Sequence, residues 1–438
     1  MENEKQLRKK IVNLTSNYFS RFHVEKTFIP GTDYVRYSGR VFDEEEGKSL
    51  INASLDFWLT AGDYAKTLEN KISDYLGIRN TMLTNSGSSA NLLAILALTS
   101  KKLGKKKLVE GDEVITVAAG FPTTVNPIYQ SNLVPVYCDV ELNTYNIKMV
   151  DLERAIKSNT KAIFLAHTLG NPFNLDTVME IAEKYELWVI EDNCDALGST
   201  WRGKLTGTYG HLSTQSFYPP HHITLGEGGA VNTNSPQLKK NVESFRDWGR
   251  DCWCESGKDN TCGKRFDWGL GELPKGYDHK YIYSHIGYNL KVTDLQAAVG
   301  VAQMEKLPRF TEARKANHKF YLEELKKYEE FFLLPHKADE ADPSWFGFII
   351  TLREGAPFSR NQIVEYLEDS KVATRMLFGG NLTKQPAYIG KKNRIVSNLK
   401  NTDYIMNNSF WIGVYPGITK EMRSYVLSVF ENFMKLYI

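Results

Sequence analysis

The chain has 438 residues, of which 42% are hydrophobic and 24% charged, and its formal net charge is +2 at pH 7. This composition is typical of a globular protein with one large domain and a smaller one, and the small charge gives no indication of nucleic-acid binding. The longest apolar runs, such as Leu92–Leu98, are too short to span a bilayer, and the charged start predicts no signal peptide. We therefore expect a cytoplasmic protein without membrane segments.

Amphipathic spacing predicts an N-terminal helix over 4–22, and a loop-rich segment follows with a helix over 44–55. Helices and apolar strands then alternate along the chain. The predicted strands cover 80–84, 113–117, 134–139, 162–166 and 187–191. The predicted helices cover 64–75, 91–99, 124–130, 149–157 and 175–185. This alternation is typical of βαβ units, so we expect an α/β fold with a mostly parallel sheet, helices on both faces, and ligands at the carboxyl ends of the strands.

The second half of the chain is less regular. A strand over 212–218 leads through a Gly-rich turn to a second strand, and a helix is expected over 237–247. Residues 249–285 lack periodicity and are rich in Cys, Gly, Trp and charge, which is typical of a functional or docking insert. Further elements are predicted over 292–303, 308–328, 345–352, 360–370 and 420–437. We expect an N-terminal arm and loop over 1–60, a large domain over 61–305 that carries the insert, and a small α+β domain over 306–438.

The most informative segment joins the two strands after residue 212. It contains Ser216-Phe217, a turn with two prolines, the pair His221-His222, and Gly-Glu-Gly-Gly over 226–229. It resembles the DegT/DnrJ/EryC1/StrS sugar aminotransferase family, in which a Lys occupies the position of His221 and binds the cofactor covalently. The resemblance implies a fold type I enzyme of the pyridoxal-phosphate-dependent aminotransferase kind. Because His221 has no amine, ordinary transamination is not expected, and family members with this change resemble sugar dehydratases that use pyridoxamine phosphate or pyridoxal phosphate.

An imidazole can still move protons near neutral pH, so His221 is the expected catalytic residue. His222 takes this role if the register is shifted by one residue, although the family motif favours His221.

Other positions match the family's cofactor site. Gly87, Ser88 and Ser89 lie where a strand enters a helix, and free amides and the helix dipole there suit a phosphate group. The resemblance adds four residues to the site: the Ser216 hydroxyl near the phosphate, Asp192 on the pyridine nitrogen, Asp195 near the ring oxygen and Phe121 stacked on the ring.

The family motif also implies a shared site. Asn289, in Gly-Tyr-Asn-Leu-Lys, matches an Asn that reaches the phosphate of the neighbouring subunit, which predicts a homodimer. Arg375 and Lys384 lie where family members contact the nucleotide sugar, and ordinary surface charge is an equally good reading of both.

Five cysteines, an odd number, argue against a disulfide framework. Cys252, Cys254 and Cys262 lie close together in the insert, and Cys194 follows Asp192 by two residues. Four thiolates suit zinc or an iron–sulfur cluster, and the spacing alone does not decide between them.

Within the family, His221 together with these four cysteines resembles an iron–sulfur dehydratase. The resemblance implies loss of the 3-hydroxyl from a CDP-linked 4-keto-6-deoxyhexose, in 3,6-dideoxysugar and O-antigen lipopolysaccharide biosynthesis. Electrons would come through a [2Fe–2S] cluster from an NAD(P)H-dependent flavin and iron–sulfur reductase. The alternatives are a cluster-independent dehydratase that releases ammonia, a nucleotide-sugar aminotransferase, and a zinc-binding regulatory relative without activity.

Overall fold

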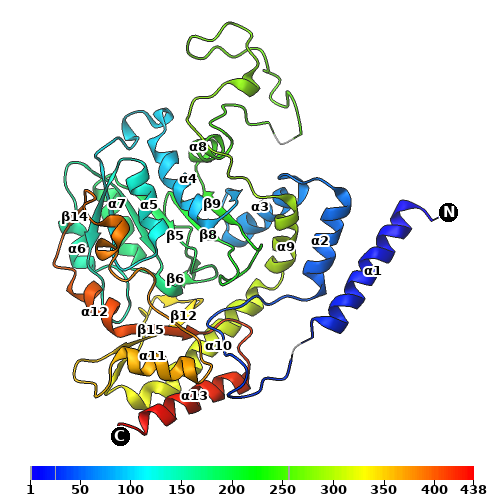
Figure 1. The fold of residues 1–438 in the computed structure, drawn as a ribbon. Helices are drawn as coiled ribbons and strands as arrows, with labels where there is room; N and C mark the ends of the chain where they lie inside the picture. Colours follow the sequence, from blue (N-terminus) through cyan, green and yellow to red (C-terminus); the bar gives the residue numbers. More distant parts are fainter. Residues whose placement is uncertain (1, 25, 255–256) are drawn as a thin grey trace.

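A computed structural model describes residues 2–24, 26–254 and 257–438. Its centre is a sheet of eight strands in the order β1-β9-β8-β5-β4-β2-β3-β14 (Figure 1). In that order the strands are Asn80–Thr84, Gly229–Thr233, Leu212–Ser216, Trp188–Asp192, Thr160–Ala166, Glu113–Val117, Val134–Cys138 and Arg394–Ile395.

Neighbouring strands from β14 to β8 are parallel, and β9 runs antiparallel to both of its neighbours, β8 and the edge strand β1. The predicted mostly parallel sheet is therefore confirmed. Strand β14 has no counterpart in the sequence predictions, because two residues are too few to show a strand period. It places Arg394 and Ile395 at the outer edge of the large sheet, beside β3.

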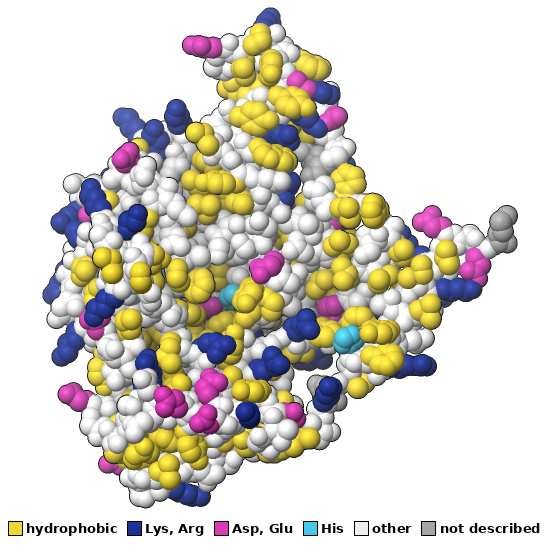
Figure 2. All heavy atoms as spheres, viewed as in Figure 1, with side chains coloured by type: hydrophobic (Ala, Val, Ile, Leu, Met, Phe, Trp, Pro, Cys, Tyr) yellow, Lys and Arg dark blue, Asp and Glu magenta, His cyan; other side chains and the backbone are white. Residues whose placement is uncertain are grey.

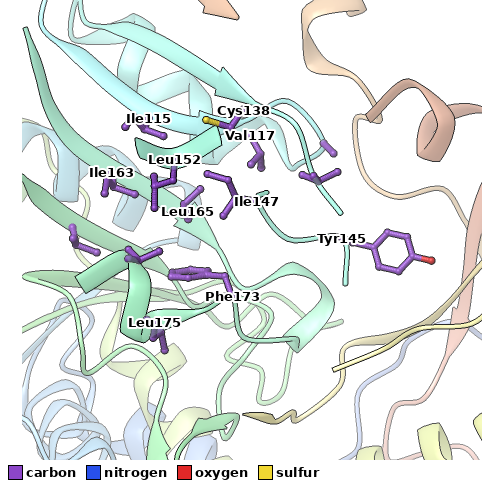
Figure 3. Close-up of a cluster of buried hydrophobic side chains, with 14 of the residues drawn as sticks. Ile115, Val117, Cys138, Tyr145, Ile147, Leu152, Ile163, Leu165, Phe173 and Leu175 are labelled. Atoms are coloured by element: carbon purple, nitrogen blue, oxygen red, sulfur yellow. The ribbon is translucent and has the colours of Figure 1, made fainter. Parts of the chain in front are cut away.

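Helices cover both faces of this sheet because its strands are apolar on both sides. On one face, Ala162 and Phe164 of β4 pack with Leu93 and Leu238 from α4 (Gly87–Thr99) and α8 (Pro236–Arg246). On the other face, Ile163 packs with residues of α6 (Met149–Arg154) and α7 (Leu175–Lys184), as Figure 3 shows. The remaining helices of this part are α3 (Asp63–Leu76), α5 (Pro122–Gln130) and α9 (Asp294–Met304).

The C-terminal part has its own antiparallel sheet, in the order β10-β12-β15-β13. These strands are Phe332–Leu333, Gly347–Leu352, Ser409–Gly413 and Thr374–Arg375. Its helices are α10 (Leu307–Leu325), α11 (Arg360–Asp369), α12 (Lys400–Asn408) and α13 (Lys420–Met434). A small sheet of β6 (Thr200–Trp201), β7 (Lys204–Leu205) and β11 (Ala341–Asp342) links this part to the large sheet. The predicted small α+β C-terminal unit is thus present.

Two further features lie outside the central layers. Helix α1 (Glu4–Phe22) has no buried residue and contacts α2 (Glu44–Asp56) through an ion pair of 2.6 Å between Arg8 and Asp56. The Cys-rich insert follows α8 and projects away from the sheet (Figure 1), with its two ends joined by a β-bridge between Arg250 and Tyr283. None of the helices in the described ranges is long and apolar enough to cross a membrane.

Candidate active site

A cavity of about 930 Å³ opens at the carboxyl ends of the parallel strands. Val117, Ala166, Asp192 and Ser216, at the ends of β2, β4, β5 and β8, all line it. This edge is where α/β folds bind ligands, because loops and helix N-termini converge there. Nine of the residues predicted from the sequence line this one cavity: Gly87, Ser88, Phe121, Asp192, Cys194, Asp195, Ser216, His221 and Arg375.

Asp192 is a buried carboxylate in a fixed orientation. Its Oδ2 accepts hydrogen bonds from Asn91 Nδ2 at 2.9 Å and Thr124 Oγ1 at 2.7 Å. Its Oδ1 accepts the backbone amide of Cys194 at 3.2 Å. The sequence analysis missed Asn91 and Thr124, although Asn91 lies one turn after Ser88 on α4 and so shares its face. A carboxylate held in this way can receive a ring N–H from the cavity.

The N-terminus of α4 forms another part of the wall. A Cβ added to Gly87 would lie 2.4 Å from Cβ of Ser216, so only glycine lets the helix end come this close to β8. Ser86 is the N-cap, and its Oγ accepts the backbone amide of Ser89 at 3.1 Å. Ser89 is outside the cavity lining because its side chain faces this cap. Free amides and the Ser88 and Ser216 hydroxyls remain in the lining, which fits a phosphate group.

His221 lies on the same wall, beside an acid. Its Nε2 is 3.4 Å from Oδ1 of Asp195, and its ring centroid lies 5.2 Å from that of Phe346. Burial raises the pKa of Asp195, although His221 acts to lower it. Nδ1 of His221 is buried and has no hydrogen-bond partner among the described residues. The site thus combines a helix end for an anion, a carboxylate for a ring nitrogen and an imidazole, and this set fits a vitamin B6 phosphate.

His222 is placed differently. It is buried outside the lining of the large cavity, and its Nε2 hydrogen-bonds the Ser344 carbonyl at 2.7 Å. Burial, with a contribution from the Arg314 charge, lowers its pKa well below the ordinary value, so the ring is neutral. Of the two histidines, only His221 faces the large cavity.

Arg314, which the sequence analysis missed, fixes the turn that carries His221. Its Nη2 donates to the carbonyls of His221 at 3.0 Å and Pro220 at 3.3 Å, and its Nη1 donates to that of Trp345 at 3.2 Å. Burial lowers the pKa of Arg314 to about 9, so it remains charged at neutral pH. A single arginine in the middle of α10 gives no sequence signal for this role.

The side of the cavity nearer the C-terminal sheet is aromatic. Trp411 lies between Tyr37 and Phe346, with ring centroids 5.4 Å and 5.5 Å away, and all three line the cavity. The Arg375 guanidinium lies over the Tyr37 ring at 3.9 Å. Phe121 is half exposed and meets Phe378 edge-to-face, so its ring is available to a ligand.

Besides Ser89 and the cysteines of the insert, the predicted residues Lys384 and Asn289 lie outside the cavity lining. Lys384 forms an ion pair with Asp403 at 2.7 Å. Asn289 forms a β-bridge with Asp247 and accepts a hydrogen bond from Lys291 Nζ at 2.6 Å. Its expected contact with the phosphate of a neighbouring subunit stays a prediction.

The four cysteines of the predicted metal site lie on two parts of the chain, three in the insert and Cys194 after β5. Cys252, Cys254 and Cys262 gather around His279 in the insert, with each Sγ 3.0 to 3.9 Å from Nε2 of that histidine. Cys194 instead lines the cavity, where burial and the Asp192 charge raise the pKa of its thiol well above the ordinary value. The structure brings Cys252 and Cys254 together with His279 but without Cys194, so the expected grouping of Cys194 with the other three cysteines stays a prediction. The sequence analysis missed His279, although it lies within the Cys-rich segment.

Comparison with known proteins agrees with this geometry. Residues 41–431 match the model of the DegT/DnrJ/EryC1/StrS aminotransferase family. The chain is 54% identical over 430 residues to the lipopolysaccharide biosynthesis protein RfbH of Salmonella typhimurium, with 98% of each chain covered. It is 51% identical over 416 residues to dTDP-4-dehydro-2,6-dideoxy-D-glucose 3-dehydratase of Saccharopolyspora spinosa, covering 95% of this chain and 90% of the relative.

Among solved structures, it is similar to the E. coli GDP-4-keto-6-deoxy-D-mannose-3-dehydratase with bound hydrated pyridoxal phosphate. The TM-score is 0.81 at 27% sequence identity, over 91% of this chain and 99% of the other. The architecture is that of fold type I enzymes, as expected from the sequence. The chain therefore belongs to the DegT/DnrJ/EryC1/StrS aminotransferase family.

Proposed function

We propose that this protein is a pyridoxamine-phosphate-dependent dehydratase that removes the 3-hydroxyl of a CDP-linked 4-keto-6-deoxyhexose, in 3,6-dideoxysugar biosynthesis for O-antigen lipopolysaccharide. The names of the two relatives reported above support a role in lipopolysaccharide or deoxysugar biosynthesis and a 3-dehydration. The choice of cytidine as the base of the nucleotide depends on the sequence resemblance alone.

One observation carries the proposal: an imidazole stands where the family motif has its lysine, and it faces the cavity beside Asp195. Without that amine, the cofactor is held by non-covalent contacts only. A proton-transfer group remains at the reacting centre, which favours dehydration over amino-group exchange.

Different residues of the chain have different roles in the proposed reaction. When bound, pyridoxamine phosphate supplies an amine that can condense with a ketone and a ring that accepts electron density. Ser88, Ser216 and the start of α4 would hold its phosphate, and Asp192 would accept a hydrogen bond from the ring nitrogen. The imidazole of His221 would take a proton from the cofactor carbon that bears the amine and deliver one to the departing 3-hydroxyl, which leaves as water.

The aromatic side of the cavity is the proposed sugar-nucleotide subsite. Tyr37 and Trp411 offer ring faces to a base or sugar, and the Arg375 guanidinium offers a partner for diphosphate. Lys384 is a weaker candidate because Asp403 neutralises it.

We further propose that the cysteines hold a [2Fe–2S] cluster, which would receive single electrons from an NAD(P)H-dependent flavin and iron–sulfur reductase and reduce the dehydrated sugar. Exposed hydrophobic side chains gather on the projecting insert (Figure 2). Trp253, Phe266 and Tyr281 are among them, and charged side chains of both signs lie between them. This surface is the proposed reductase contact, and a homodimer is proposed through Asn289.

The test supplies anaerobically purified protein with pyridoxamine phosphate and CDP-, dTDP- or GDP-linked 4-keto-6-deoxyhexose. Mass spectrometry should show loss of the 3-oxygen, fastest with the CDP sugar. If only another nucleotide sugar were dehydrated, the choice of cytidine as the base would be disproved. If no substrate were dehydrated, the proposed function would be disproved.

The variant His221→Lys tests the role of the imidazole at the position of the family's lysine. It should lower dehydration by about 10²–10⁴-fold, the usual contribution of a general acid–base group. It should also bind pyridoxal phosphate covalently, as seen by absorption and by mass after borohydride reduction. Unchanged dehydration would remove His221 from the mechanism. His222→Asn serves as the control, because His222 does not face the large cavity.

A second candidate is a dehydratase that uses no cluster and releases ammonia. The potential metal ligands that lie close together in the structure, Cys252, Cys254 and His279, do not include Cys194, and this favours the second candidate. Stoichiometric ammonia from protein without iron or sulfide would establish this candidate instead.

A further inference from the structure

Phe378 has an unusual backbone conformation on the wall of the large cavity. Its φ is 46°, in the left-handed region that bulky residues rarely adopt. Among the non-glycine residues that the structure describes with a positive φ, only Phe378 lines the large cavity. A residue keeps such a costly conformation only where the surrounding structure enforces it, and such residues gather at binding and catalytic sites. This backbone indicates that Phe378 has a role in the site.

Hydrogen bonds on both sides of Phe378 enforce this conformation. Its amide donates to the carbonyl of Met376 at 2.8 Å, which closes a γ-turn. The amide of Gly379 donates to the carbonyl of Gly120 at 3.2 Å, and the Gly379 carbonyl accepts Nε2 of Gln385 at 2.9 Å. Gly120 lies between β2 and α5, so the turn is attached to the carboxyl edge of the large sheet.

The fixed turn brings the ring of Phe378 against that of Phe121. The ring centroids lie 5.9 Å apart and the planes meet at 89°, which is the edge-to-face arrangement that aromatic pairs prefer. Phe378 also packs against the hydrophobic core cluster that contains Leu377 and Trp411, so its ring is anchored in the protein. Within the described part of the chain, this is the one ring-to-ring contact that Phe121 makes.

The contact restricts a side chain that the helix start does not fix. Phe121 is the N-cap of α5, so the helix sets its backbone, whereas its side chain is 51% exposed. An exposed ring has several rotamers, and binding a flat ligand against one of them costs entropy. An edge-to-face partner favours one orientation before the ligand binds. Phe378 therefore prepares the face of Phe121 for a planar ligand.

We propose that Phe378 is a positioning residue of the cofactor site, because its left-handed backbone places its ring against Phe121 and thereby orients Phe121 to stack on the pyridine ring. Phe378 acts through Phe121 and not by its own contact with the cofactor. The inference rests on the proposed function only for the use of a vitamin B6 phosphate. It does not depend on the nucleotide base or on the iron–sulfur cluster.

The first experiment measures the affinity of the full chain for pyridoxamine phosphate by fluorescence titration. Phe378→Ala should raise Kd by about 2- to 10-fold, the contribution of an aromatic pair, whereas Phe378→Tyr keeps the ring and should restore binding. In the Phe121→Ala background, Phe378→Ala should cause no further loss, because no ring remains to be positioned.

A loss of equal size in both backgrounds would overturn the inference. An unchanged Kd in Phe378→Ala would also overturn it and would leave the proposed dehydration standing. If the affinities follow the expected pattern but no nucleotide sugar is dehydrated, the proposed function alone fails.

The second experiment tests the backbone of Phe378 through the melting temperature of the cofactor-free full chain. Phe378→Gly and Phe378→Ala both lack the ring, but only glycine adopts the left-handed region without cost, so Phe378→Gly should melt at the higher temperature. Both variants should bind pyridoxamine phosphate with the same weakened affinity.

Glu186 is the matched control, because it is exposed, has a φ of 52° and follows α7 outside the cavity lining. Glu186→Gly should also melt above Glu186→Ala, and neither variant should change Kd. A higher melting temperature for Phe378→Ala than for Phe378→Gly would overturn the inference, because the strained backbone would then be absent from the protein in solution.

Discussion

Nε2 of His221 and Oδ1 of Asp195 lie 3.4 Å apart on the wall of the large cavity. A carboxylate at this distance stabilises the charged imidazolium that forms when His221 takes up a proton. Asp195 is partly buried, with 14% of its side chain exposed, and burial raises the pKa of its carboxyl. The protonation state of Asp195 therefore determines how readily His221 accepts a proton.

This relationship predicts a pH dependence. As the pH falls through the raised pKa of Asp195, the carboxylate takes a proton and its support for His221 is lost, so the rate should fall. Asp195→Asn should lower kcat about tenfold at neutral pH and should remove this acid limb from the pH–rate profile. An unchanged acid limb in the variant would show that another group causes it.

The turn that carries His221 should depend on Arg314. Arg314→Met leaves several buried carbonyls without a donor, which should lower the free energy of unfolding by about 3 kcal/mol. Arg309→Met, on the exposed side of the same helix, should change it by less than about 0.5 kcal/mol. Urea unfolding measures both.

Arg314→Lys separates positioning from stability. A lysine keeps the charge but cannot reach the carbonyls on both sides, so kcat should fall while KM changes little. If stability falls but the kinetics and pH–rate profile do not change, Arg314 is a structural residue only.

Gly87→Ala tests the close approach between α4 and β8. The added methyl group would lie 2.4 Å from Cβ of Ser216, so it should push the helix end away and cost about 1–3 kcal/mol in stability. Affinity for pyridoxamine phosphate, measured by fluorescence titration, should fall as well. Gly120→Ala is the matched control for stability, because Gly120 also lines the cavity and its added methyl meets nothing within 4 Å.

An acid-sensitive ion pair joins β14 to β2 within the large sheet. Arg394 Nε donates to Oε1 of Glu113 at 2.8 Å. Although burial acts to raise it, hydrogen bonds from Arg394 and Thr160 hold the pKa of Glu113 below its ordinary value. The pair therefore stabilises the fold above the unfolded pKa of about 4.3, and this contribution is lost as the pH falls through the lower folded pKa.

Arg394→Met should consequently cost about 1–3 kcal/mol at pH ~6, and the difference from the natural protein should shrink as the pH drops below ~4. Lys184→Met is the control, because its partner Glu153 is exposed and such surface pairs contribute at most about 1 kcal/mol. A cost that is independent of pH would mean that Arg394 acts through packing alone.

The sequence by itself determined the alternating architecture, the sheet edge that carries the site and the identity of His221 as the unusual residue. These features are local: apolar strand periods, the Gly and Ser residues at the start of α4, and a motif within residues 216–229. The placement of His221 and Asp192 follows from them because parallel strands bring their carboxyl ends to one edge.

Only the tertiary structure decided which distant side chains meet. Arg314 on α10 reaches the His221 carbonyl, Arg394 completes the edge of the sheet, and His279 enters the cysteine group while Cys194 stays in the cavity. No sequence period encodes these contacts, because each depends on how separately formed elements pack. A short strand or a single buried cation gains its stability from its partners rather than from its neighbours in the chain.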